Sequence, residues 1–274
     1  MKILITGANG MLGKDLSKVL ENLNHEVINT DVHNLDITNK SVAEKFILEE
    51  NPEIVIHCAA YTDVDNAEKH FETAFNINVV GTKNIATATA KINSIFIYIS
   101  TDYVFDGENK KPYEKDDIPN PINNYGRTKL LGEEVVKKLC KKYYIVRTSW
   151  LYGIYGKNFV EKMIELKDEP EIKVVRDQIG CPTWTVELSK GLIYIMESKP
   201  YGIYHICGKN ETSWYDFAKE IFRQEGLNVN LIPCSSEEFI RPAKRPKYSV
   251  MLGEAICNDW EISLVEYLKL RKIL

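Results

Sequence analysis

KILITGANGMLG, at residues 2–13, determines which architecture this chain adopts. The first residues are apolar or β-branched and predict a strand, and residues 11–22 have the apolar spacing of an amphipathic helix. Between them, Gly7 permits a tight turn, Gly10 lets backbone approach a pyrophosphate, and Gly13 lets the helix pack closely on the strand. Free N–H groups at the start of the helix would face an anion. The stretch therefore predicts a dinucleotide-binding turn, the alternative being a domain of this fold that binds nothing.

The next predicted strand ends on an acidic residue. Residues 25–31 read HEVINTD, and Asp31 closes the run. An acid at this position accepts hydrogen bonds from a ribose diol and repels a 2′-phosphate. No Lys or Arg follows closely, so charge alone favours NADH over NADPH.

Short β-rich runs alternate with amphipathic stretches through the first half of the chain. This βαβ rhythm predicts a Rossmann-like, doubly wound parallel sheet with helices on both faces. One helix is expected across residues 68–91 and another from about 124 to 142. Beyond residue 150 the rhythm loosens. We expect a dinucleotide-binding domain at 1–150 and a smaller C-terminal α/β substrate domain at 151–274, with some segments returning to the first.

Composition excludes several classes of protein. The 274 residues are 44% hydrophobic, and 35 Lys plus Arg against 39 Asp plus Glu give a net charge of −4. An acidic chain is a poor candidate for nucleic acid or a membrane surface. No apolar run is long enough to span a bilayer or to form a signal peptide, which predicts a cytoplasmic protein. The six cysteines are far apart, without a CxxC pair, and are expected to be buried free thiols.

A phenol and an ammonium stand four residues apart at Tyr125 and Lys129, on one face of a predicted helix. A nearby cation favours phenolate and would lower the Tyr pKa, as a general acid requires. Chance alone predicts about 1.5 such pairs in this composition. Tyr215 and Lys219 form a second pair, which we interpret as surface or packing residues. Tyr125 follows the strand that ends near Thr101, where ligands bind in open α/β sheets.

Five segments together resemble the extended short-chain dehydrogenase/reductase superfamily: residues 7–13, 57–62, 78–82, 100–107 and 125–129. Further segments at 147–153, 158–159, 177–183 and 245–246 extend the likeness over nearly the whole chain and make it similar to the dTDP-4-dehydrorhamnose reductase family. The resemblance implies reduction of the 4-keto group of dTDP-4-dehydro-L-rhamnose to dTDP-L-rhamnose, with hydride from NADPH or NADH. It also implies a role in polysaccharide biosynthesis.

By the same resemblance, Thr101, Tyr125 and Lys129 are the expected catalytic residues. The expected cofactor contacts are Gly7, Gly10, Met11, Leu12, Gly13, Asp31, Asp36, Ile37, Ala59, Ala60, Tyr61, Asn78, Tyr125 and Lys129. The expected substrate contacts are Thr101, Asp102, Tyr103 and Trp150. Some members of the family dimerise around a metal, so Mg²⁺ is possible. Asp15 and Glu187 stand at plausible positions without a convincing third acid, so we predict no metal site and a monomer or homodimer.

Several residues keep two interpretations. Trp150 could pack in the core or stack on a base or sugar, and His57 is more typical of a packed histidine than of a base. The basic segment at 241–247 could approach the substrate diphosphate or be a solvated loop.

Two rival functions remain open. A nucleotide-sugar epimerase or dehydratase shares the fold. The resemblance gives the dehydratases a Thr-Asp-Glu motif, however, and this chain has Tyr103 in place of the glutamate. A non-catalytic regulatory subunit of methionine adenosyltransferase shares it as well, although Thr101, Tyr125 and Lys129 are all present.

Overall fold

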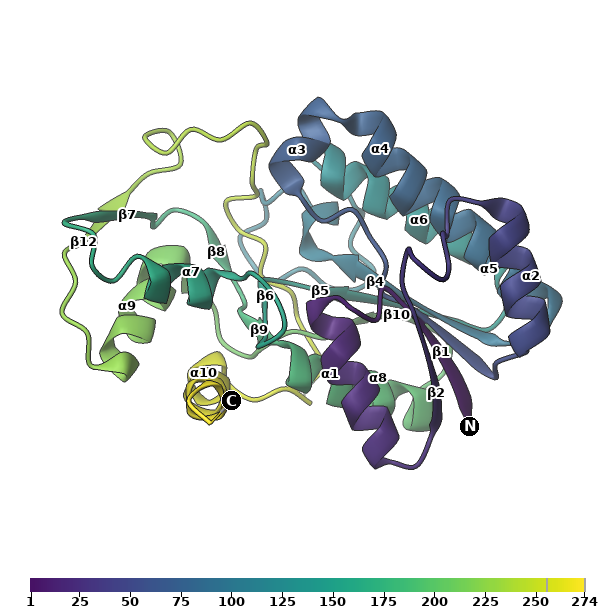
Figure 1. Cartoon of the computed structure of the whole chain (residues 1–274). Coiled ribbons are helices and arrows are strands. Elements are labelled where there is room, and N and C mark those ends of the chain that lie inside the picture. The colour runs from purple at the N-terminus through teal and green to yellow at the C-terminus, as the bar shows by residue number, and fades with distance from the viewer. Residues whose placement is uncertain (255, 274) are drawn as a thin grey trace.

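A six-stranded parallel sheet forms the centre of the computed structural model, which describes residues 1–254 and 256–273 (Figure 1). Its strand order confirms the doubly wound sheet, since the direction in which successive strands are added reverses between β1 and β3. The strands, in order across the sheet, are β10 (Gly202–His205), β5 (Tyr143–Thr148), β4 (Ile95–Thr101), β3 (Ile54–His57), β1 (Lys2–Thr6) and β2 (Glu26–Thr30). β1, β3 and β4 are almost wholly buried, as parallel strands covered on both faces must be.

Helices cover both faces of this sheet (Figure 1). On one face, α1 (Met11–Asn22) and α8 (Thr185–Ser198) bury leucines against Ile3 and Ile5. The opposite face buries Leu4, Phe96 and Tyr98 beneath α2 (Lys40–Glu50), α5 (Thr82–Lys91) and α6 (Asn124–Leu139). The alternating sides of each strand therefore supply two separate cores.

The prediction of a single helix across residues 68–91 is wrong. The chain forms α3 (Val64–Lys69) and α4 (Phe71–Phe75), then a π-helical turn η1 (Asn76–Gly81) before α5. A π-turn inserts an extra residue per turn and often occurs at functional sites. Here it places the side chain of Asn78 toward the loop after β3, where it hydrogen-bonds the backbone of Tyr61. Periodicity cannot reveal this, because each fragment keeps an apolar stripe.

The second half forms a smaller lobe beside the sheet, around the aromatic cluster of Phe217, Trp260 and Tyr267 (Figure 1). Its helices are α7 (Phe159–Glu165), α9 (Trp214–Glu225) and α10 (Trp260–Arg271). Its strands are β6 (Leu151–Tyr152), β7 (Ile172–Val175), β8 (Ile179–Gly180), β9 (Thr183–Trp184), β11 (Thr212–Ser213) and β12 (Leu231–Cys234). Although they follow residue 150, α8 and β10 belong to the large sheet and its covering layer.

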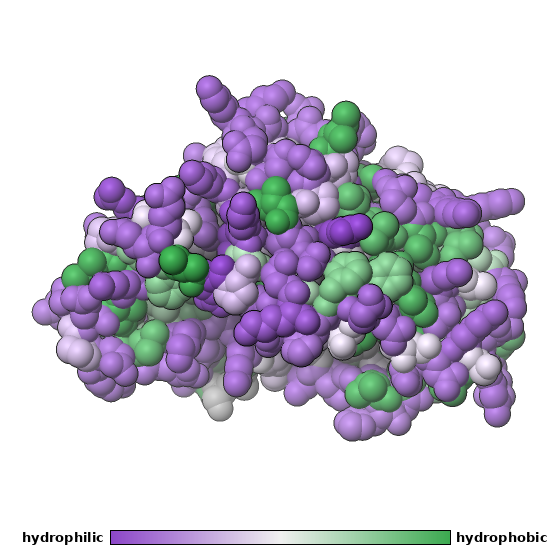
Figure 2. Space-filling view, turned by 90° about the horizontal axis from the view of Figure 1, so that it is seen from above, coloured by the Kyte–Doolittle hydropathy of each residue, from purple (hydrophilic) through white to green (hydrophobic). Residues whose placement is uncertain are grey.

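The face seen from above is largely hydrophilic, with hydrophobic side chains gathered mainly over the half that carries the large sheet (Figure 2). Within the described part of the chain, no helix has both the length and the apolar character to cross a membrane. The six cysteines are free thiols, five of them buried and Cys58 half-buried.

Candidate active site

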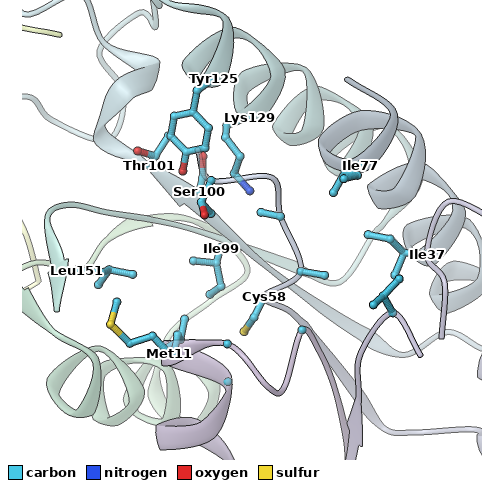
Figure 3. Close-up of a pocket in the computed structure, with 18 of the residues that line it drawn as sticks. Met11, Ile37, Cys58, Ile77, Ile99, Ser100, Thr101, Tyr125, Lys129 and Leu151 are labelled. Carbon is cyan, nitrogen blue, oxygen red and sulfur yellow. The ribbon is translucent and has the colours of Figure 1, made fainter. Parts of the chain in front are cut away.

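A cavity of about 1550 Å³ opens at the carboxyl ends of β1, β3, β4 and β5. Its wall brings together most of the residues predicted from the sequence, and Figure 3 shows Met11 and Cys58 on one side with Tyr125, Thr101 and Lys129 on the other. The expected residues in the wall are Gly7, Gly10, Met11, Leu12, Gly13, Asp31, Asp36, Ile37, Ala59, Ala60, Thr101, Asp102, Tyr125, Lys129 and Trp150.

The glycine turn forms a cradle that side chains would fill. Gly7 has φ +66°, and a Cβ there would lie 2.8 Å from the backbone of Ala59. A Cβ on Gly13 would lie 2.5 Å from the carbonyl oxygen of Gly7. Gly10 is the N-cap of α1 and supplies no side chain to cap it, so the first N–H groups of the helix are left for a ligand. The close packing predicted for these glycines is therefore present, and the cradle suits a pyrophosphate.

Asp31 stands at the end of β2, held by backbone donors. Its carboxylate accepts hydrogen bonds from the N–H of Val32 at 2.7 Å and of Asn9 at 3.2 Å. These bonds fix the side chain beside the glycine turn, and each oxygen keeps a further lone pair for a ribose hydroxyl.

The predicted catalytic residues lie together on one side of the cavity (Figure 3). The expectation that the pKa of Tyr125 lies below its ordinary value is wrong. Burial raises the pKa of Tyr125 above its ordinary value and outweighs a hydrogen bond with Thr101, which acts in the opposite direction. Burial also lowers the pKa of Lys129 to about 7, although Glu133 and Cys58 oppose the shift. Removal from water thus acts on both groups more strongly than they act on each other.

Asp102 carries a carboxyl that the sequence did not mark as ionisable near neutrality. It is 2% exposed, and burial raises its pKa to about 7 against the hydrogen bonds of Ser249 and Thr101. The hydroxyl of Ser249 donates to one carboxylate oxygen at 2.6 Å and that of Thr101 to the other at 3.0 Å. Ser249 comes from the C-terminal segment, and no local sequence signal connects it to this site.

Trp150 is held in an unusual conformation at the edge of the cavity. Its φ is +47°, a strained value for a bulky residue. Its ring stacks on Trp214 at a centroid distance of 3.5 Å, and Gly180 leaves room for its edge. One face of the indole is thus occupied by Trp214, a partner that the sequence did not indicate.

Three predicted contacts lie outside the cavity wall. Asn78 is 1% exposed, and its amide also donates to the hydroxyl of Thr128 at 3.0 Å. The backbone N–H and carbonyl of Tyr61 form hydrogen bonds with the side-chain amide of Asn78. Tyr103 packs edge-on against Tyr125 at 6.0 Å. None of the three lines the cavity, and Tyr103 contacts its wall through Tyr125.

Other candidates take structural positions. His57 is 1% exposed and lies between the hydroxyls of Thr6 and Thr82, so the packed-histidine interpretation is confirmed. Tyr215 packs against the core of the smaller lobe.

The basic segment at 241–247 binds an acid of the other half of the chain. Arg241 and Arg245 both form ion pairs with Asp65 on α3, and the N–H of Ala243 donates to the same carboxylate at 3.1 Å. The segment is thus tied to α3 through Asp65, with the side chain of Arg241 half-exposed and that of Arg245 more buried.

The two acids considered for a metal have other partners. Asp15 accepts a hydrogen bond from the hydroxyl of Thr185, and Glu187 pairs with Lys190 at 3.0 Å. Among residues 1–254 and 256–273, no three His, Cys, Asp or Glu side chains are grouped to hold a metal ion.

Comparison with known proteins places the whole chain in one family. Residues 1–271 match the family described as the RmlD substrate binding domain. The spore coat polysaccharide biosynthesis protein SpsK of Bacillus subtilis is 38% identical, and the alignment covers 98% of each chain.

Two solved structures are similar over their full length. A dTDP-4-dehydrorhamnose reductase from Clostridium acetobutylicum is 50% identical with a TM-score of 0.97, covering 99% of this chain and 100% of the other. One from Bacillus anthracis, in complex with NADP, is 44% identical with a TM-score of 0.95, covering 98% and 100%.

Proposed function

The chain belongs to the RmlD substrate-binding-domain family, whose relatives include dTDP-4-dehydrorhamnose reductases, and from this we propose that it is itself a nicotinamide-dependent reductase of that kind. It would reduce the 4-keto group of dTDP-4-dehydro-L-rhamnose to give dTDP-L-rhamnose for polysaccharide biosynthesis in the cytoplasm, as a monomer or homodimer. The observation that carries the proposal is the meeting of Tyr125, Lys129 and Thr101 in the cavity that begins at the glycine turn.

The residues of the cavity fit a dinucleotide. The cradle of Gly7, Gly10 and Gly13 with the uncapped start of α1 suits its pyrophosphate, and Asp31 suits a ribose diol. When bound, NADH or NADPH supplies the hydride. The fixed carboxylate of Asp31 favours NADH by charge, whereas the relative from B. anthracis binds NADP.

Tyr125 donates a proton to the sugar oxygen as that oxygen gains charge. A raised pKa keeps its phenol protonated at neutral pH, which is the form a proton donor needs. Lys129 in its ammonium form stabilises the phenolate left behind and can bind the nicotinamide ribose. Its pKa near 7 means that this form is lost as pH rises through neutrality.

Thr101 orients the reacting oxygen in concert with Asp102. While Asp102 is ionised, the hydroxyl of Thr101 donates to it. Protonation of Asp102 near pH 7 frees the threonine proton for the substrate oxygen, where a positioned donor is worth about 3–4 kcal/mol. Asp102 and Trp150, in the cavity wall, would contact the substrate, whereas Tyr103 would act through its contact with Tyr125.

Purified protein supplied with dTDP-4-dehydro-L-rhamnose and either NADH or NADPH tests the proposal. We expect the nicotinamide absorbance to fall and dTDP-L-rhamnose to appear with at least one of the two. Isomerised or dehydrated product without net consumption of reduced cofactor would contradict a reductase. Absence of turnover with retained cofactor binding would contradict the proposal that the protein is an enzyme.

A further inference from the structure

Helix α6 carries a third functional side chain in line with Tyr125 and Lys129. Glu133 follows Lys129 by four residues, so the three side chains lie along one face of the helix. Glu133 is fully buried, and nothing in the sequence marks it. A buried carboxylate needs partners for both oxygens, and this one has them.

The partners of Glu133 come from two neighbouring strands. The hydroxyl of Ser100 on β4 donates to Oε1 at 2.6 Å. The guanidinium of Arg147 on β5 forms a two-pronged pair, with Nε 3.0 Å from Oε1 and Nη2 2.8 Å from Oε2. Ser100 and Arg147 are direct neighbours in the register of β4 and β5. The carboxylate therefore ties α6 to two adjacent strands at the edge of the cavity.

Stability alone gives little reason for such a pair. Removing two charges from water is costly, and apolar side chains of similar volume often replace a buried ion pair without loss of stability. Arg147 is 1% exposed, and its guanidinium also contacts the carbonyl of Lys115 at 3.3 Å, His205 at 3.5 Å and the ring of Phe105 at 5.1 Å from the centroid. What the ion pair supplies is a fixed direction and length for the contact between helix and strands.

That contact joins the two elements that carry the reaction. Tyr125 and Lys129 stand on α6, whereas Thr101 stands on β4 directly after Ser100. A second link, from the hydroxyl of Tyr98 to the carbonyl of Lys129, is longer at 3.3 Å. A misplacement of about 1 Å between such groups can lower a rate about a hundredfold.

We propose that Glu133 is a positioning residue for the reduction: through Ser100 and Arg147 it fixes Thr101 on β4 relative to Tyr125 and Lys129 on α6. This rests on the proposed reductase function. Glu133 does not line the cavity, so it acts through its neighbours and touches neither sugar nor cofactor.

The charge of Glu133 has a second effect, on Lys129. The groups that face Lys129 are Glu133 and Tyr125 on α6, His57 and Cys58 at the end of β3, and the ring of Tyr98 on β4, 4.1 Å from Nζ. Glu133 is the carboxylate of this set and raises the pKa of Lys129 against the effect of burial. Without it, the ammonium form of Lys129 is lost at lower pH.

Glu133→Gln tests the proposal because it keeps the shape of the side chain and removes its charge. We expect kcat at neutral pH to fall about ten- to a hundredfold, with cofactor affinity and KM within about threefold of wild type. The basic limb of the kcat–pH profile should move to lower pH. Glu134→Gln is the matched control, since Glu134 is the next residue on α6, is exposed and pairs with Lys137 at the surface. It should keep the wild-type profile.

A folded Glu133→Gln protein with the wild-type kcat and pH profile would overturn the proposal. If this variant does not fold because Arg147 loses its partner, Ser100→Ala removes a single hydrogen bond and leaves the ion pair intact. Ser100→Ala should lower kcat with little change in KM, and an unchanged kcat would overturn the proposal. A wild-type protein without reductase activity would instead refute the proposed function.

Discussion

At the scale of single residues, burial determines the protonation of the side chains around the cavity. It keeps Tyr125 protonated, brings the pKa of Lys129 down to about 7 and raises that of Asp102 to about 7. Two of the three groups thus change charge near neutral pH. The sequence predicted the identities of these residues but gave the wrong direction for the tyrosine, because neighbour spacing carries no information about desolvation.

Tyr125→Phe removes the proton donor and little else. We expect kcat to fall by about 10²–10⁴ with nearly unchanged affinity for reduced cofactor, because the ring remains and only the hydroxyl is lost. Tyr215→Phe is the control, since Tyr215 and Lys219 have the same spacing but Tyr215 packs in the smaller lobe. Initial-rate kinetics and cofactor titration by fluorescence compare the two. Equal rates in both variants would remove Tyr125 from the mechanism.

At the scale of elements, the first strand, turn and helix follow closely from sequence, whereas the region after β3 does not. Three glycines permit the turn at residues 7–13, and close packing excludes side chains at Gly7 and Gly13. The π-turn at Asn78 depends on contacts with Tyr61 and Thr128, which are distant in sequence. Local periodicity is therefore insufficient where tertiary hydrogen bonds choose the helix type.

Gly10→Ala and Gly13→Ala separate binding from packing within the turn. A Cβ on Gly13 meets backbone at 2.5 Å, so this variant should lose about 1–3 kcal/mol of unfolding free energy. Gly10 has φ −72°, and its Cβ would approach the oxygen of Gly7 only to 3.1 Å. Gly10→Ala should therefore lose under about 1 kcal/mol of unfolding free energy. It should still weaken cofactor binding about tenfold, because the methyl group occupies the surface that faces the pyrophosphate.

Urea unfolding and cofactor titration of both glycine variants give the comparison. A larger loss of stability in Gly10→Ala than in Gly13→Ala would contradict the assigned roles.

At the scale of the whole molecule, contacts between the two halves hold residues in and near the cavity wall. Ser249 reaches Asp102, Trp214 stacks on Trp150, and Arg241 and Arg245 bind Asp65. None of these pairs is close in sequence, so the sequence could predict one partner of each but not the contact. The central sheet, by contrast, repeats a local βαβ pattern and was predicted from it.

Acid should destabilise the whole molecule through its buried histidines. Burial lowers the pKa of His57 and of His205 to about 3, so the folded chain binds fewer protons than the unfolded chain between about pH 6.5 and 3. Their contribution to the free energy of unfolding is complete above pH 6.5. It is lost as the pH falls through this window, by at most about 1.4 kcal/mol per pH unit for each histidine.

His57→Asn should flatten the dependence of unfolding free energy on pH between about 7 and 5. His33→Asn, at an exposed site, should leave the wild-type slope. Urea unfolding at several pH values measures both slopes, and a wild-type slope in His57→Asn would show that this histidine is not held neutral by the fold.

Transfer of deuterium from the cofactor tests most directly whether the nicotinamide and the keto sugar meet beside Tyr125. The reaction would use reduced dinucleotide with deuterium at both C4 positions of the nicotinamide, and mass spectrometry and NMR of the product would locate the label. We predict one deuterium at C4 of the sugar in each molecule of dTDP-L-rhamnose. A product without deuterium, or with deuterium at another carbon, would contradict direct hydride transfer in this cavity.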